Sequence, residues 1–204
     1  MLPHCTEHEK IFCTLQTMST GYKIKDQEGV YYFMLQVVHW ADVFTRQIYR
    51  DIVIDGFRYC KDNKGLDIFA FVIMSNHIHL LTKSYRGELS DTVRDFKRHT
   101  SKKIVEQILV GRESRREWLL SIFEPAAKQH KRNNKYQFWT HENHPEHIYS
   151  NKFIAQKIIY IHENPVRGGI VESPEEYIYS SAKAYAGEDC ILDVTVLTLP
   201  WIMY

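Results

Sequence analysis

The sequence lacks long apolar runs, internal repeats and low-complexity linkers. Its 204 residues contain no stretch that approaches about eighteen consecutive apolar residues, so we expect no helix that crosses a membrane. The first segment, MLPHCTEHEKIFCTLQT, lacks the basic and then apolar layout of a secretory signal. With 44% hydrophobic and 25% charged residues, the composition is that of a globular chain large enough to bury its own core.

Closely spaced cysteines and an excess of one charge are also missing. The four cysteines are Cys5, Cys13, Cys60 and Cys190. Because they show no CxxC spacing, we expect no disulfide framework and a cytoplasmic location. A net charge of +1 neither predicts nor forbids a nucleic acid partner, but basic residues gather at 94–103 and 128–135.

The order of the predicted elements indicates an α+β fold, a ferredoxin-like sandwich with helices packed on an antiparallel sheet. β-branched and aromatic residues predict strands, and apolar residues at helical spacing predict helices. Strands are expected at 30–40, 66–75, 77–84, 136–139 and 191–199. Helices are expected at 45–65, 89–109, around 116–128, and at 151–165, where Pro165 closes the last one.

These elements divide the chain into three parts. An N-terminal extension covers 1–29, with Met18 as an alternative start. The main domain covers 30–187 and carries a charged insertion at about 112–135. A C-terminal strand and tail cover 188–204.

Two histidines lie one residue apart in the apolar segment AFVIMSNHIHLLTKS, residues 70–84. Side chains at i and i+2 of a strand point to the same face, so His77 and His79 aim together while Ile78 faces the other side. Two imidazoles at this spacing can share one divalent cation. They can equally line the solvated face of a half-exposed sheet, and the pair alone does not decide between these interpretations.

The helix at 151–165 carries the second candidate group. Tyr160 and Asn164 are four residues apart and lie on one helix face, which Lys157 shares. The Asn164 carboxamide oxygen can complete a metal site beside the Tyr160 hydroxyl. In the alternative interpretation, Tyr160 is an interfacial aromatic residue and Asn164 is a helix-end residue held by Pro165.

Such a set of side chains suits one kind of chemistry. A tyrosine hydroxyl, with a pKa of about 10, is a poor nucleophile that needs an activated electrophile. A divalent ion polarises a phosphodiester oxygen and orients the phosphate for in-line attack. The product is a 5′-phosphotyrosine bond to DNA, which conserves the bond energy, so that cleavage is reversible without ATP.

The segments VIMSNHIHLL and YIHENPVRGGIV resemble the two signatures of single-tyrosine HUH transposases, in particular the branch of REP-associated tyrosine transposases. FWTHENHP and EEYIYSSAKAYAG are similar to flanking segments of this branch, so the resemblance covers roughly residues 20–187. It implies a ferredoxin-like fold, a homodimer, a requirement for Mg²⁺ or Mn²⁺, and cleavage of single-stranded DNA near hairpins. It also implies that Tyr160 is the nucleophile and that the metal ligands are His77, His79 and Asn164.

Other residues offer alternatives for the nucleophile and for a metal site. Tyr149 is a rival nucleophile, although the residue four positions after it is Phe153 rather than an amide. The segment HCTEHEKIFC, residues 4–13, contains zinc ligand types at a spacing that fits no common zinc finger. The segment HENHPEH, residues 141–147, also contains metal ligand types, and we favour a solvated loop for it.

Basic residues supply candidate DNA contacts, since a single strand needs phosphate neutralisation and aromatic stacking. Four of them fall on one ridge of the helix at 89–109: Arg94, Lys97, Arg98 and Lys102. A second patch consists of Lys128, Lys131, Arg132 and Lys135. Lys157 is expected to hold the scissile phosphate beside Tyr160. The alternative for each patch is a solvated surface.

The predicted function is cleavage and rejoining of single-stranded or hairpin DNA in DNA transposition. One alternative is a domesticated DNA-binding protein of the same fold without transposition, and another is a nuclease of the replication-initiator or relaxase type. We also expect a symmetric dimer joined through sheet edges, because the apolar segments VYYFMLQVV and HIHLLTK invite pairing with a second copy.

Overall fold

The computed structural model describes residues 24–129, 135–142 and 144–199. Its longer elements are β1 (Tyr31–Gln36), α2 (Gln47–Lys64), β2 (Leu66–Ile73), β3 (His77–Ser84), α3 (Leu89–Val110), α4 (Arg116–Lys128), β4 (Glu146–His147) and α5 (Asn151–Arg167). Four short helical segments are η1 (Val38–Trp40), η2 (Val43–Thr45), η3 (Pro174–Glu176) and α6 (Ala182–Tyr185). The zinc candidate at 4–13 and the alternative start Met18 lie outside the described residues.

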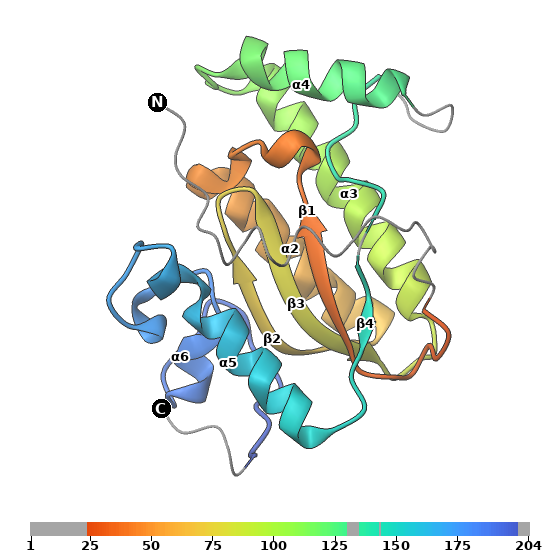
Figure 1. The fold of residues 1–204 in the computed structure, drawn as a ribbon. Coiled ribbons are helices and arrows are strands. Elements are labelled where there is room, and N and C mark those ends of the chain that lie inside the picture. The colour runs from red at the N-terminus through yellow and green to blue at the C-terminus, as the bar shows by residue number, and fades with distance from the viewer. Residues whose placement is uncertain (1–23, 130–134, 143, 200–204) are drawn as a thin grey trace, which may run out of the picture.

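The strands form one four-stranded antiparallel sheet in the order β2-β3-β1-β4. Figure 1 shows α2 and α3 behind this sheet and α5 in front of it. The predicted α+β architecture, with helices packed on an antiparallel sheet, is therefore confirmed. None of the helices in the described ranges is both long and apolar enough to cross a membrane.

The register of the sheet decides which residues face which helices. Phe33, Leu80 and Phe71 are neighbours across β1, β3 and β2, and they share one face. The Phe71 ring lies 5.9 Å from the ring of Phe57 on α2, so this face is the core under α2 and α3. The next row of side chains, which includes His79, points to the opposite face, toward α5.

The two helices behind the sheet approach each other closely at Gly56 of α2. A Cβ atom at this position would lie 2.9 Å from Thr100 and 3.0 Å from Phe96, both on α3. Next to this contact, the rings of Phe57 and Phe96 stack with centroids 4.7 Å apart. A side chain at position 56 would therefore push α3 away from the core that supports the sheet.

Several predicted elements differ from the structure. Residues 136–139 form no strand and contribute an isolated bridge between Trp139 and Val37. Residues 191–199 form no strand, because the outer edge of β2 already bonds to other backbone groups. Tyr179 O accepts from Ile73 N–H at 2.9 Å, and only Thr195 of the C-terminal segment bonds to β2 as well. α5 continues past Pro165 to Arg167, since one proline in the last turn removes only one helical hydrogen bond. The first strand ends at Gln36 rather than at residue 40.

The strands that were expected to offer free edges for a dimer lie inside the sheet. β3 has β2 on one side and β1 on the other, and β1 lies between β3 and β4. Backbone bonds from Thr140 to Gln36 and from Ile148 to Val30 extend the coverage of β1 beyond the two residues of β4. The physical argument for a dimer through these two strands is therefore wrong, and the dimer itself stays a prediction.

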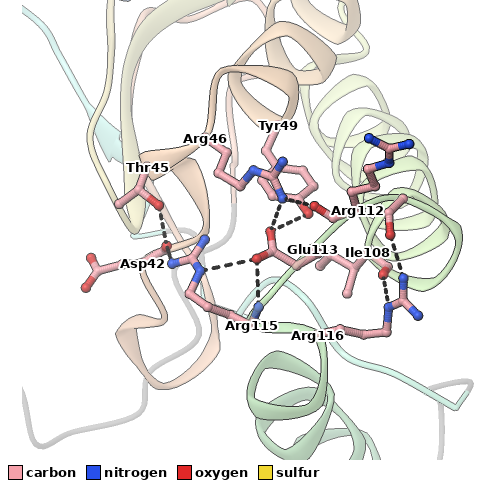
Figure 2. Close-up of polar contacts among 10 residues, drawn as sticks. Asp42, Thr45, Arg46, Tyr49, Ile108, Arg112, Glu113, Arg115 and Arg116 are labelled. Carbon is pink, nitrogen blue, oxygen red and sulfur yellow. Dashed lines mark hydrogen bonds and ion pairs between the residues drawn. The ribbon is translucent and has the colours of Figure 1, made fainter.

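A buried carboxylate fastens the segment between α3 and α4 to α2. Figure 2 shows Glu113 among Arg46, Tyr49 and Arg115. Its side chain is 1% exposed, and it accepts from the Tyr49 hydroxyl at 2.8 Å and from Arg46 at 3.1 Å. Burial alone raises the pKa of Glu113, but hydrogen bonds from the Arg115 backbone, Tyr49 and Arg46 prevail and lower it to about 2.

This network predicts that Glu113→Gln destabilises the fold in a pH-dependent way. A carboxyl whose pKa falls on folding adds stability above its unfolded pKa of about 4.5, and this stability is lost as the pH falls toward 2. We expect a loss of about 2–3 kcal/mol at pH 7, which shrinks between pH 4.5 and the lowest measurable pH.

Urea unfolding followed by circular dichroism at pH 7, 4.5 and 3 measures this loss. The control is Glu106→Gln on α3, whose half-exposed side chain lies 3.9 Å from Lys102 and should contribute less than about 0.5 kcal/mol. Equal effects of the two substitutions at pH 7 would contradict the prediction.

Candidate active site

The pairing of β1 with β3 brings the two histidines onto the face that α5 covers. His77 is opposite Gln36, and His79 is opposite Met34. The ring centroids are 4.7 Å apart, and the two Nε2 atoms face each other at 3.1 Å. His79 is 2% exposed, so the structure closes one side of the pair and leaves His77 nearer to solvent.

The Nδ1 atom of each imidazole has its own partner. The Tyr32 hydroxyl lies 2.6 Å from His79 Nδ1, with the two rings stacked. Asn76 Oδ1 lies 2.7 Å from His77 Nδ1, and the Asn76 amide donates to Asp42 at 3.0 Å. Metal-binding histidines usually have such a partner on the second nitrogen, because it fixes the ring orientation.

Burial controls the charge of His79 and of its partner Tyr32. It lowers the pKa of His79 well below its usual value, and the neighbouring His77 lowers it further. Burial likewise raises the pKa of Tyr32 far above its usual range, and Tyr160 adds to the shift. His79 therefore stays neutral at ordinary pH, which is the form that binds a metal ion.

Helix α5, which packs on the face of the sheet that carries the histidines, places Tyr160 beside His79. Ser150 caps the helix by accepting the backbone N–H of Phe153, while Ile158 and Ile161 are fully buried. Tyr160 is left at the rim of the contact with the sheet, with 40% of its surface exposed. Its ring centroid lies 5.4 Å from that of His79, within the same chain.

Asn164 lies one turn after the tyrosine, and its side chain contacts His79. Its amide nitrogen donates to the backbone oxygen of Tyr160 at 2.7 Å, which turns the amide oxygen away from the helix. A hydrogen bond with the Asn164 side chain opposes the lowering of the His79 pKa, as an acceptor oxygen does. The structure thus brings together the two histidines, the amide and the tyrosine.

The donor atoms fit a divalent ion. Two nitrogens that bind one ion at about 2.1 Å are about 3.0 Å apart when the angle at the ion is about 90°. The observed 3.1 Å between the Nε2 atoms matches this separation. Residues 24–129, 135–142 and 144–199 hold no group of three His, Cys, Asp or Glu side chains that could bind a metal. Within these ranges, a third protein ligand would be of another type, such as the Asn164 oxygen.

The rival candidates near β4 do not join this group. Tyr149 is 83% exposed, and its ring lies 4.0 Å from that of His147. His147 stacks on Tyr31, whose side chain alternates with that of Tyr32 and therefore lies on the face of β1 away from the histidine pair. The described histidines of 141–147 belong to no group of three His, Cys, Asp or Glu side chains that could hold a metal ion, and the solvated loop stays a prediction.

The predicted phosphate contact Lys157 is close to the site but already paired. Its ammonium lies 2.5 Å from Glu146 and 4.2 Å from the centroid of the Tyr32 ring, and its side chain is 15% exposed. An arginine that the sequence analysis missed contacts the tyrosine. The Arg167 guanidinium covers the Tyr160 ring at 4.4 Å and donates to the Tyr160 backbone oxygen at 2.8 Å. Its signal in the sequence is the i+7 spacing, two helical turns after the tyrosine.

The helix that carries the predicted ridge, α3, lies behind the sheet, whereas α5 lies in front of it (Figure 1). Three members of the ridge pair with acidic residues of the same helix: Arg94 with Asp91 and Asp95, Arg98 with Asp95, and Lys102 with Glu106. Lys97 points elsewhere and donates to Thr140 O at 2.8 Å, and burial lowers its pKa to about 8. Lys97 is therefore half-buried and bonded to Thr140, while DNA contact by the ridge stays a prediction.

The described lysines of the second basic patch also have partners within the protein. Lys128 pairs with Glu124 at 3.1 Å, and Lys135 lies over the Tyr136 ring at 5.2 Å. Lys131 and Arg132 lie outside the described residues. Nothing in the described part of this patch connects it to the histidine pair.

Trp40 is a second residue that the sequence analysis missed. Its ring lies edge-on to that of His77 with centroids 5.5 Å apart, yet 48% of its surface is exposed. His39 and Trp40 both have left-handed backbone conformations, with φ of 53° and 55°. A bulky residue adopts this conformation rarely, at a cost of about 1–3 kcal/mol. Because residue types at 39 and 40 do not indicate such a conformation, the sequence analysis did not place Trp40 beside His77.

Comparison with known proteins gives a family match and a match in fold. The family model described as "Transposase IS200 like" matches residues 27–158, which include both histidines and end before Tyr160. A solved structure of a REP-associated tyrosine transposase bound to a REP hairpin has a TM-score of 0.54 and 16% sequence identity. The similarity covers 92% of this chain and 98% of that chain, and at this identity it shows a shared fold. No curated protein matches.

The site predicts that the protein binds Mn²⁺ through the histidine pair. Electron paramagnetic resonance of free Mn²⁺ should show binding by the unchanged protein and a loss of affinity of more than about 100-fold in His77→Ala. Tyr160→Phe should keep the affinity, because the hydroxyl is not among the proposed ligands. The control is His99→Ala on the exposed side of α3, and the same loss there would contradict the prediction.

Proposed function

We propose, from the premise that this chain belongs to the family of IS200-like transposases, that it cleaves and rejoins single-stranded DNA near hairpins through Tyr160. The observation that carries the proposal is the convergence of the tyrosine ring, the histidine pair and Asn164 within one chain. The transposase structure with the same fold holds a hairpin, which supports hairpin DNA as the substrate class.

The proposed reaction is a transesterification. The Tyr160 oxygen attacks the phosphorus, loses its proton and forms the phosphotyrosine bond. The bond from phosphorus to the 3′ oxygen breaks, and this oxygen leaves as a 3′ hydroxyl. Attack by a 3′ hydroxyl on the phosphotyrosine reverses the reaction and rejoins the strand.

Residues around the tyrosine would supply binding and orientation. His77, His79 and Asn164 would hold Mg²⁺ or Mn²⁺, which polarises the phosphate and orients it for in-line attack. The exposed Arg167 guanidinium beside the tyrosine ring offers a bidentate contact to phosphate oxygens. The exposed Trp40 ring beside His77 offers a face on which a base can stack.

The complete residue set favours chemistry over DNA binding alone. A domesticated binding protein needs neither the opposed Nε2 atoms nor an exposed tyrosine beside them. A nuclease of the replication-initiator or relaxase type would use the same residues, and family membership favours transposition.

The site can form in a monomer, because tyrosine and histidines of one chain meet. The expected homodimer stays a proposal, and two copies would have to meet through surfaces other than β1 and β3.

Cleavage should depend on Tyr160 and not on Tyr149. Tyr160→Phe removes the nucleophilic oxygen, so we expect a loss of more than about 1,000-fold in cleavage of a labelled single-stranded hairpin oligonucleotide from the flanks of the gene with Mn²⁺. The covalent adduct on denaturing gels should disappear with it. Tyr149→Phe is the control, and full activity of Tyr160→Phe would transfer the role to another residue.

The substitutions Arg167→Gln and Arg98→Gln should have different effects on DNA cleavage. Arg167→Gln should lower cleavage at saturating DNA by about 10-fold or more, because the guanidinium lies beside the nucleophile. Arg98→Gln lies behind the sheet and should change the cleavage rate by less than about twofold. If only Arg98→Gln weakens binding and lowers its salt dependence, the predicted α3 ridge carries the phosphate contacts.

A further inference from the structure

A chain of polar contacts reaches His77 from outside the proposed ligand set. His77 Nδ1 lies 2.7 Å from Asn76 Oδ1, and Asn76 Nδ2 donates to Asp42 Oδ1 at 3.0 Å. Behind Asp42, its backbone oxygen accepts from the Arg115 guanidinium at 2.8 Å and from the Thr45 hydroxyl at 3.2 Å (Figure 2).

We propose that Asn76 and Asp42 are positioning residues that fix the tautomer of His77. The Arg115–Glu113 pair between α3 and α4 holds Asp42 in place for this role. The inference rests on the proposed function, because it assigns these residues to the histidine pair of that site.

The direction of each hydrogen bond follows from the chemistry of the groups. An ionised carboxylate only accepts, so Asp42 requires the NH₂ group of the Asn76 amide. The amide oxygen of Asn76 then faces His77 and accepts, so His77 Nδ1 must carry the hydrogen. A neutral imidazole has one N–H, and His77 Nε2 is therefore left as a bare lone pair that points at His79.

This tautomer is the one that a metal site needs. A hydrogen on Nε2 would occupy the atom that faces His79 and block metal binding there. An imidazole without an acceptor at Nδ1 carries its hydrogen on either nitrogen. The Asp42–Asn76 pair thus selects the binding-competent form before any ion arrives.

Arg115, which bonds to the Asp42 backbone, is itself bonded to a buried carboxylate. Arg115 donates from its backbone N–H to Glu113 at 3.0 Å, and the Glu113 side chain is 1% exposed. Asp42 itself is exposed, in the segment between η1 and η2. Replacing its carboxylate therefore tests the contact without opening the core.

Long-range ¹H–¹⁵N NMR of the metal-free protein reports the tautomer of each histidine directly. His77→Gln identifies the His77 signals among the eleven histidines. We expect the Nδ1–H form in the unchanged protein and a shift toward Nε2–H in Asn76→Ala. Asp42→Asn, which removes the obligate acceptor, should produce a mixture of both forms.

The exchange variant Asp42→Asn with Asn76→Asp supplies the rescue. Its amide at position 42 can donate to the carboxylate at 76, which accepts from His77 Nδ1, so the Nδ1–H form should return. The control is Asp91→Asn, an exposed carboxylate that pairs with Arg94 on α3. Affinity for Mn²⁺ should fall by about 10- to 100-fold in Asn76→Ala and recover in the exchange variant.

An unchanged His77 tautomer in both Asn76→Ala and Asp42→Asn would overturn the inference. An equal change of the His77 tautomer in the Asp91→Asn control would also overturn it. Because the NMR measurement uses neither metal nor DNA, it stands apart from the proposed function. If the unchanged protein fails to bind Mn²⁺ or to cleave DNA, the proposed function fails while the tautomer result still decides the inference.

Discussion

The antiparallel register between β1 and β3 is the constraint on which the candidate site depends. It places Met34 opposite His79 and Gln36 opposite His77, so both imidazoles point to the face that α5 covers. A slip of one residue would turn them into the core under α2 and α3, where the Phe33 row packs. Polar rings without partners are costly there, and the apolar Ile78 and Leu80 would face the site instead. The same hydrophobic pattern that folds the sheet therefore also aims the histidines.

The second half of the site depends on how α5 sits on that sheet. Ile158 and Ile161 are fully buried, and this leaves Tyr160 and Asn164 at the rim of the contact, next to His79. The amide nitrogen of Asn164 donates to the Tyr160 backbone oxygen, so the amide oxygen can face His79. Helix, amide and tyrosine thus form one unit whose position relative to the histidines is set by apolar packing rather than by the polar residues themselves.

Local geometry explains what the sequence could predict and what it could not. The shared face of His77 and His79 follows from the strand repeat, and the shared face of Tyr160 and Asn164 follows from the helix repeat. Spacing says nothing about partners that are distant in the sequence. Lys97 has the spacing of an exposed ridge, yet Thr140, 43 residues away, takes its ammonium. The predicted C-terminal strand failed for the same reason, since residues near Tyr179 already occupy the edge of β2.

The end of β1 shows how backbone strain can serve the site. After Gln36 the chain turns through His39 and Trp40, both in left-handed conformations that cost about 1–3 kcal/mol each. Backbone hydrogen bonds hold the turn, among them one from Val38 N–H to Phe138 O at 2.9 Å. The turn places Trp40 against the His77 ring and Asp42 against Asn76, which itself contacts His77 Nδ1. A relaxed extension of β1 would carry both side chains past the histidine. The strained turn therefore allows Trp40 to contact His77 and Asp42 to contact Asn76.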